Sequence, residues 1–116
     1  MERDEELISA IAPDVLVVLR RERFFEILDD RMCPADPARL RAQCDGTYAM
    51  TTAILVKAGY DEDAITEVLL VLAARGACCD CEILFNVAEE SRLKSEYWKK
   101  RAAEAPFERH TRHSDR

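Results

Sequence analysis

The chain has 116 residues, of which 48% are hydrophobic and 34% charged, and its formal net charge is −6. This length suits one domain with a single core, and the small numbers of glycines and prolines exclude collagen-like and low-complexity classes. A pI near 5.0 argues against general nucleic-acid binding, which needs a basic surface. We therefore expect one folded domain over residues 1–105.

Basic charge is concentrated at the C-terminal end of the chain. Residues 1–91 contain nine Lys or Arg against nineteen Asp or Glu, whereas residues 92–116 contain eight against four. We expect residues 106–116 to form a basic, flexible tail; a docking arm for an acidic partner or nucleic acid is the alternative. Neither a secretory signal nor an apolar run of about 20 residues is evident, so we expect a cytoplasmic protein without membrane association.

The first predicted element is an amphipathic helix over residues 13–31. Pro13 suits the first turn of a helix, and apolar residues follow on one side at the helical period: Leu16, Val17, Phe24, Ile27 and Leu28. Val15 and Leu19 fall on the other side, so the first turns are apolar nearly all round. We expect this half of the helix to be buried or to contact a partner, which would be either an unknown protein or a second copy of the chain.

Two helices are predicted between residues 36 and 59. Asp36 followed by Pro37 suits the N-cap and first position of a short helix that ends near Cys44. The pattern from Thr47 to Ala58 predicts another helix, with Gly59 as its left-handed C-terminal residue.

A further helix is predicted between Asp61, as its N-cap, and Gly76, as its left-handed end. Its apolar residues have the helical i, i+3, i+4, i+7 spacing: Ile65, Val68, Leu69 and Leu72.

The segment that starts at Ala77 fits two structures. Apolar residues and cysteines occupy every second position from Cys79 to Val87, as on one face of a strand. Asp80 as an N-cap instead predicts a helix that continues to Lys94, with these residues facing inward: Ile83, Leu84, Val87 and Ala88. We favour the helix, with a kink near Ser91, because good helix formers follow and no second strand is predicted to pair with the first.

These elements predict an all-α, bundle-like domain of five or six helices with a cysteine cluster at helix N-termini. The predicted core consists of Phe24, Leu28, Leu55, Ile65, Leu69, Leu72, Leu84 and Val87. No catalytic triad, phosphate-binding glycine loop or His-Glu-x-x-His pair is present in the sequence, which points away from the common enzyme classes.

Cysteines carry the strongest functional signal. Cys78, Cys79 and Cys81 stand before the last long helix, and Cys44 stands before the helix that begins near Thr47. Helix N-termini stabilise thiolates, and thiolates prefer soft ions such as Zn²⁺. We expect Cys44, Cys79 and Cys81 to bind one ion, most simply zinc, with Cys78 or Cys33 completing the shell.

Other interpretations of the cysteines remain open. Cys78 and Cys81 form a Cys-x-x-Cys pair that would suit thiol redox or metal transfer, and a metal-free interaction domain would use cysteines only for packing. Glu82 is a candidate fourth ligand or hydrogen-bond acceptor, although an acidic residue in a first helical turn is common. His110 and His113 have a ligand-like spacing but lie in the polar tail, and we leave them out of the site.

The segment Cys44-Asp45-Gly46-Thr47, together with Cys79-Asp80-Cys81-Glu82-Ile83-Leu84-Phe85-Asn86-Val87, carries a resemblance. It resembles a small bacterial family, domain of unknown function 2695, with the signature Gly-Gly-x-Cys-Asp-Cys-Glu-Val-Leu-x-Asn-Val. The likeness spans roughly residues 40–88. The family pattern implies a Cys-x-His and Cys-x-Cys set of four zinc ligands. This chain has Gly46 where that histidine stands, so the resemblance implies three ligands and assigns no activity.

Overall fold

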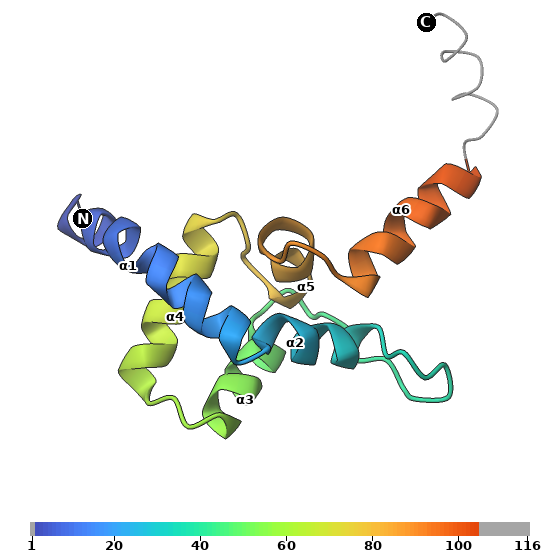
Figure 1. Ribbon diagram of the computed structural model, residues 1–116, viewed down its shortest axis with the longest axis horizontal. Helices are drawn as coiled ribbons and strands as arrows, with labels where there is room; N and C mark the ends of the chain where they lie inside the picture. Colours follow the sequence, from blue (N-terminus) through green and yellow to red (C-terminus); the bar gives the residue numbers. More distant parts are fainter. Residues whose placement is uncertain (1, 105–116) are drawn as a thin grey trace, which may run out of the picture.

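The structure is a computed structural model, which describes the backbone of residues 2–104 and the side chains of residues 5–104. The described part of the chain contains helices and no strand, so the all-α prediction is confirmed. The helices, shown in Figure 1, are α1 (Glu2–Arg21), α2 (Phe24–Met32), α3 (Ala49–Lys57), α4 (Glu62–Ala74), α5 (Asp80–Glu82), the π-helix η1 (Ile83–Val87) and α6 (Arg92–Glu104). The tail from residue 105 lies outside the described residues.

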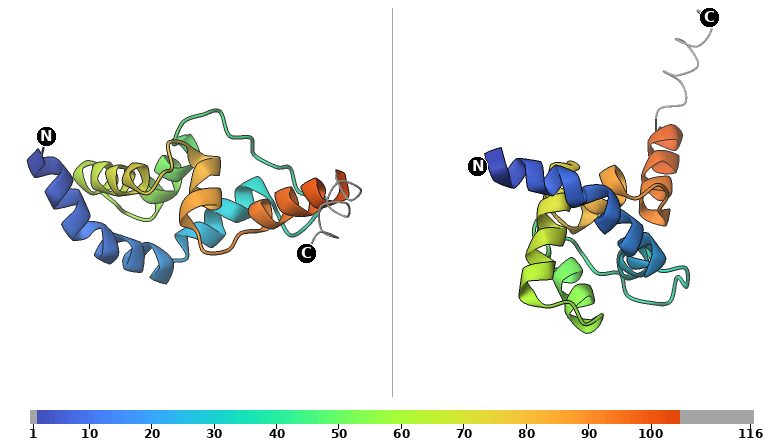
Figure 2. Two further views of the ribbon diagram at one scale, coloured as in Figure 1. Left: turned by 90° about the horizontal axis from the view of Figure 1, so that it is seen from above. Right: turned by 60° about the vertical axis from the view of Figure 1, so that its left-hand side comes forward.

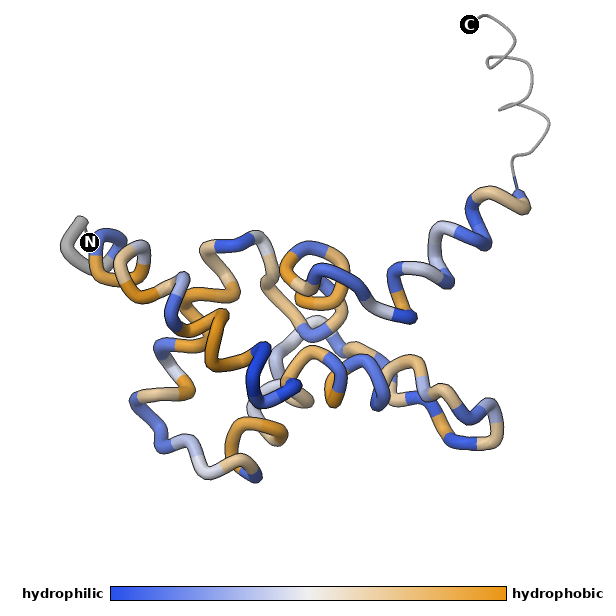
Figure 3. Tube along the Cα trace, in the orientation of Figure 1, coloured by the Kyte–Doolittle hydropathy of each residue, from blue (hydrophilic) through white to orange (hydrophobic). Residues whose placement is uncertain are grey.

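One core connects α1, α2, α3, α4 and η1. Of the eight predicted core residues, five are buried, namely Phe24, Leu28, Leu55, Leu72 and Leu84. The other three, Ile65, Leu69 and Val87, are partly buried and pack against that core. Figure 3 shows apolar residues gathered where α1 crosses α4, while α6 is mostly hydrophilic. Helical periodicity therefore identified the buried positions well, because it reports directly which side of each helix avoids water.

The predicted helix over 13–31 is wrong at its start and in its continuity, although its end lies within one residue of the end of α2. Helix α1 begins at Glu2, and Pro13 lies inside it, where its missing N–H removes one bond of the helical ladder. Figure 2 shows that α1 curves along its length, as a proline inside a helix commonly causes.

The same predicted helix is interrupted at Arg23, which has a left-handed φ of 62° and separates α1 from α2. This turn lets α1 pack on α4 while α2 packs on α3 and η1. Beyond the turn Phe24 and Phe25 are both buried, and their rings meet edge to face with centroids 5.3 Å apart.

The predicted short helix from Asp36 to Cys44 is also wrong. Asp36 caps only one turn, with its side chain accepting a hydrogen bond from Ala38 N at 2.9 Å. Leu40, the large aliphatic residue of this segment, is 94% exposed and packs against nothing, and helical stability in proteins comes mainly from packing. It is instead a loop whose Ala42 N–H donates to the Arg31 carbonyl at 2.8 Å.

Helices α3 and α4 begin and end as the sequence indicates, within a residue or two. Gly59 and Gly76 have φ values of +97° and +93°, which confirms them as left-handed helix ends. Asp61 caps α4 by accepting a hydrogen bond from Ala64 N at 2.8 Å.

The predicted helix from Asp80 to Lys94 is divided into three parts. One turn of α5 leads into η1, whose Ile83 and Leu84 are fully buried as predicted, and the chain is then extended at Ala88. Helix α6 begins after this break, and the buried carboxylate of Asp29 accepts from Arg92 N at 2.7 Å and Leu93 N at 3.1 Å. The kink expected near Ser91 is thus a complete break, since α6 has its own N-terminal cap from α2.

Candidate metal centre

Three cysteine sulfurs meet between the start of α3 and the start of α5. The Sγ atoms of Cys44, Cys79 and Cys81 all lie within 4.8 Å of one another, and those of Cys79 and Cys81 are 3.5 Å apart. All three residues are partly exposed. Two segments separated by more than thirty residues in the chain therefore contribute to one thiol cluster.

Asp80 holds the second segment against the first. Its fully buried carboxylate accepts from Met50 N at 3.0 Å, from Thr51 N at 3.0 Å and from Thr51 Oγ1 at 2.7 Å. Its own N–H donates to the Thr47 carbonyl at 2.9 Å. The sequence predicted Asp80 as the cap of its own helix. That prediction is wrong, because the N-cap of α5 is Cys79 and the Asp80 carboxylate caps α3 instead.

A second bond ties the two segments beside the cluster, since the hydroxyl of Tyr48 donates to the Ala77 carbonyl. Burial is the main cause that raises the pKa of Tyr48, and the negative charges that Cys78 and Cys79 can carry add to it. The phenol therefore keeps its proton for this bond.

Cys44 stands in a tight turn before α3. Gly46 N donates to the Cys44 sulfur at 3.4 Å, and Asp45 Oδ1 accepts from Thr47 N at 3.1 Å and Thr47 Oγ1 at 2.6 Å. Gly46 has a φ of +87°, a left-handed conformation that side chains rarely adopt. The glycine at this position thus suits a turn that aims a backbone N–H at the sulfur.

The protein environment acts in opposite directions on two of the thiols. Burial raises the pKa of Cys44, but this is outweighed by N–H groups of Cys81 and Gly46 and by the Cys79 and Cys81 thiols, so the pKa lies below its ordinary value. Burial is also the main cause that raises the pKa of Cys81 to about 12, and its thiol contacts with Cys79 and Cys44 add to the rise. The surroundings thus favour the thiolate form of Cys44 and disfavour that of Cys81.

The two candidates for a fourth ligand lie apart from this group. Cys78 is exposed, and its N–H donates to Glu82 Oε1 at 2.7 Å. Cys33 is buried at the end of α2, where its carbonyl accepts from Arg92 Nε at 2.8 Å. Among the described residues, the structure therefore brings together three of the five predicted ligands. The Glu82 carboxylate accepts the hydrogen bond from the backbone N–H of Cys78. His110 and His113 lie outside the described residues.

The most important supporting residue is one whose role the sequence did not reveal. The sequence indicated Asp80 only as a cap of its own helix, whereas its actual partners, Met50 and Thr51, are about thirty positions away. No local pattern links these residues, because the contact depends on how α3 and α5 meet.

Fold and cluster together define a small all-helical domain with a three-thiol site at the junction of two helix N-termini. The chain belongs to the family described as "Protein of unknown function (DUF2695)", which matches residues 24–86, or 63 of its 116 residues. This match runs from the first residue of α2 to the last but one of η1 and includes all the residues of the thiol cluster. No curated protein and no solved structure matches the chain. No helix in the described part is both long and apolar enough to cross a membrane.

Proposed function

We propose that this protein is a metal-binding module in which Cys44, Cys79 and Cys81 hold one soft ion, with zinc as the preferred ion. The observation that carries the proposal is the meeting of three sulfurs within 4.8 Å, from segments on either side of α3 and α4. Because thiolate is a soft ligand and no carboxylate joins the group, the donor set favours Zn²⁺ over Mg²⁺ or Ca²⁺.

The distances fit this donor set. Zinc–sulfur bonds are about 2.3 Å long, so two sulfurs on one zinc ion lie less than about 4.6 Å apart. The three sulfurs lie within 4.8 Å of one another, so only small side-chain rotations would be needed to bring them to bonding distance of one ion. Metal binding would release the thiol protons. Because the pKa of Cys81 is raised, removing the proton from Cys81 would cost the most free energy, and this cost grows as the pH falls.

We further propose that Cys78 completes the shell. It directly precedes Cys79, and its exposed side chain has room to turn toward the ion. Cys33 is a poorer candidate, since it is buried at the end of α2 and its backbone is hydrogen-bonded to Asp29 and Arg92.

The ion would act as a cross-link between the long loop before α3 and the turn before α5. Such a link stabilises the folded state because the unfolded chain lacks the assembled site. We therefore assign a structural or accessory role and no catalytic one. The reduced thiols that this role needs are typical of the cytoplasm, where we place the protein.

Thiol redox chemistry is the second candidate, and one observation favours it: the Cys79 and Cys81 sulfurs are 3.5 Å apart. The pair would be Cys79 or Cys44 with Cys81, rather than the Cys78 and Cys81 pair that the sequence suggests, since Cys78 lies apart from the group. Metal transfer would use the same sulfurs.

The deciding experiment measures metal in protein purified without added metal, followed by cobalt substitution. We expect one zinc per chain and, with Co²⁺, the intense near-ultraviolet absorption of sulfur-to-cobalt charge transfer. Cys44→Ser should abolish stoichiometric binding. Cys33→Ser is the matched control, because it removes a cysteine outside the cluster and should leave the stoichiometry unchanged.

Three results would count against the proposal. Protein without metal that gains no cobalt–sulfur band is not a metal module. Equal effects of Cys44→Ser and Cys33→Ser would show that binding is not at the cluster. A defined disulfide within the cluster after equilibration with glutathione, and no metal, would favour the redox candidate. Cys78→Ser separately tests the fourth ligand, since it should weaken binding and alter the cobalt spectrum.

A further inference from the structure

Helix α6 presents an aromatic surface that the rest of the described chain leaves uncovered. None of its residues is buried, and Trp98 is 58% and Tyr97 40% exposed. The Tyr97 ring contacts those of Phe85 and Trp98 edge to face, at centroid distances of 5.4 Å and 5.0 Å. A helix of this length is marginal in water by itself, and neighbouring exposed aromatic rings are typical of contact surfaces.

A basic residue flanks these rings on the exposed side of α6. Arg101 lies one turn after Trp98, whereas the ammonium of Lys94, one turn before it, donates to the carbonyls of Phe85 and Ala88 in its own chain. The Arg101 guanidinium is 5.9 Å from the centre of the Tyr97 ring and donates to the Tyr97 hydroxyl at 3.1 Å. We call Tyr97, Trp98 and Arg101 the α6 face; it is suited to an apolar groove with acidic edges.

A groove of that kind lies between α1 and α4. It has a volume of about 240 Å³, and its lining includes Val15, Val18 and Val68. One exposed carboxylate from each helix borders it, Asp14 from α1 and Glu67 from α4. We call this the α1–α4 groove, and its charge is opposite to that of the α6 face.

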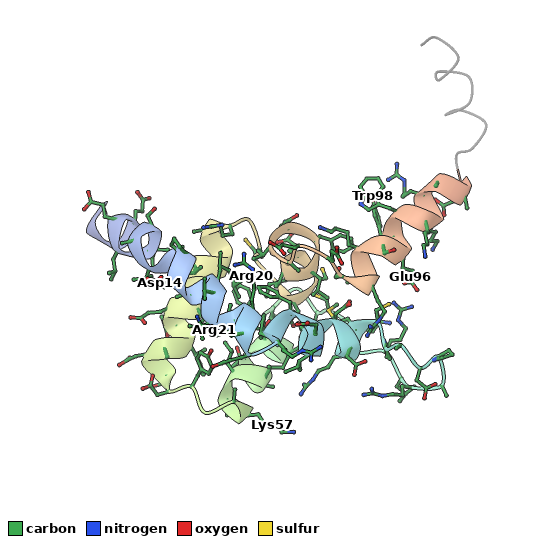
Figure 4. The ribbon with its side chains drawn as sticks, in the orientation of Figure 1. Asp14, Arg20, Arg21, Lys57, Glu96 and Trp98 are labelled. Carbon is green, nitrogen blue, oxygen red and sulfur yellow. The ribbon has the colours of Figure 1, made fainter. Side chains whose placement is uncertain are left out.

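We propose that the α6 face of one copy docks into the α1–α4 groove of a second copy, which makes the protein a twofold homodimer. The Trp98 indole would enter the groove, with Arg101 facing the carboxylates of Asp14 and Glu67. In Figure 4, Trp98 and Asp14 lie in opposite halves of the molecule, so one chain cannot make this contact with itself. A twofold arrangement of two copies would make this contact twice and close the dimer, whereas any other arrangement of the same two surfaces would add further copies.

This dimer modifies the interface that the sequence suggested. Most apolar residues between 13 and 31 are used within the chain, since Leu16, Leu19 and Leu28 are buried. The large apolar residues that α1 leaves exposed are Leu7, Val17 and Val18, and Val18 lines the groove together with the partly buried Val15.

The only tryptophan in the chain reports on the contact directly. Sedimentation velocity of the full chain over increasing concentration should show a monomer-to-dimer transition, and Trp98 emission should shift to shorter wavelength over the same range. Added salt should weaken the dimer, because the flanking ion pairs are screened. A monomer at every concentration, with unchanged emission, overturns the proposal.

Charge reversal identifies the interface. Arg101→Glu and Glu67→Arg should each weaken dimerisation at least about tenfold, whereas an equimolar mixture of the two variants should dimerise like the wild type. The mixture restores both contacts, because each reversed side chain meets the oppositely charged partner that it needs. The double variant in one chain should also recover.

Lys99→Glu is the matched control, since it makes the same charge change on α6 but about half a turn away from Arg101. It should leave the dimer unchanged. Equal weakening by Lys99→Glu and Arg101→Glu, or a dimer that neither reversal alters, overturns the assigned interface. Far-ultraviolet circular dichroism confirms that each variant is folded. All of these measurements are independent of the metal content.

Discussion

Replacing Asp80 with asparagine tests how the thiol site is held together. The substitution keeps the size of the side chain but removes its charge and converts one oxygen to an amide nitrogen. The Asp80 carboxylate is fully buried and accepts three hydrogen bonds from the start of α3, from Met50 N, Thr51 N and Thr51 Oγ1. The new amide can keep the bonds of one oxygen only, and its NH₂ group then faces another donor.

The expected cost follows from these contacts. Hydrogen bonds to a charged group contribute about 1.5–3 kcal/mol each, and an unsatisfied buried donor costs about 1–3 kcal/mol. Since Asp80→Asn weakens the retained bonds and leaves Met50 N without its acceptor, we expect a loss of about 2–4 kcal/mol in the free energy of unfolding. The free energy of unfolding of a whole domain is only about 5–15 kcal/mol, so this loss should be large and easily measured.

Urea unfolding followed by circular dichroism measures this loss, and Asp61→Asn is its matched control. Asp61 is an exposed N-cap of α4 with one bond, to Ala64 N at 2.8 Å. Asparagine and aspartate are about equally good N-caps, so Asp61→Asn should change the free energy of unfolding by less than about 0.5 kcal/mol. If Asp80→Asn costs no more than Asp61→Asn, the reasoning that this carboxylate ties α5 to α3 is refuted.

Three further predictions concern the fold. Burial, followed by the hydrogen bond to Glu22, raises the pKa of Tyr60 from 10.0 to about 12, so its contribution to stability is complete below pH 10 and is lost between pH 10 and 12. Urea unfolding between pH 10 and 12 should show that the free energy of unfolding falls more steeply with pH for the wild type than for Tyr60→Phe. Parallel pH dependences of the two proteins would contradict this prediction. Arg23→Gly should raise the free energy of unfolding, measured with urea, by up to about 1 kcal/mol, because Arg23 has a left-handed φ of 62° and its ion pair with Glu26 is exposed. A lower free energy of unfolding would show that the Arg23 side chain stabilises the fold by more than its backbone strain costs. Leu28→Ala should cost about 2–5 kcal/mol by chemical denaturation, since Leu28 is fully buried, and a cost below about 1 kcal/mol would mean that the core there collapses around the gap.

The sequence by itself indicated most of the helical segments and most of the residues that form the core. Helical periodicity identified Leu55, Leu72 and Leu84 as core, and glycine at 59 and 76 marked two helix ends. These features are local: a side chain's preference for the core repeats every 3.6 residues, and a left-handed C-terminal residue needs only the right amino acid at the right place.

Helix boundaries that depend on packing could not be predicted in this way. Arg23 carries no local signal for a break, yet α1 and α2 separate there because each has a different neighbour to cover. The segment after Asp36 has good helix-start residues and still forms a loop, since its Leu40 side chain is exposed and does not pack on the core.

The sequence alone predicted which cysteines form the thiol cluster. Whether their sulfurs meet depended on the tertiary structure. The sequence indicated that Cys44, Cys79 and Cys81 stand before helices, and the family resemblance pointed to the same three residues. Only the packing of α3 against α5 decided that their sulfurs meet, while Cys78 and Cys33 lie apart from them. The physical reason is the Asp80 carboxylate, which satisfies the N–H groups of a helix about thirty residues away and so fixes a contact that no local pattern encodes.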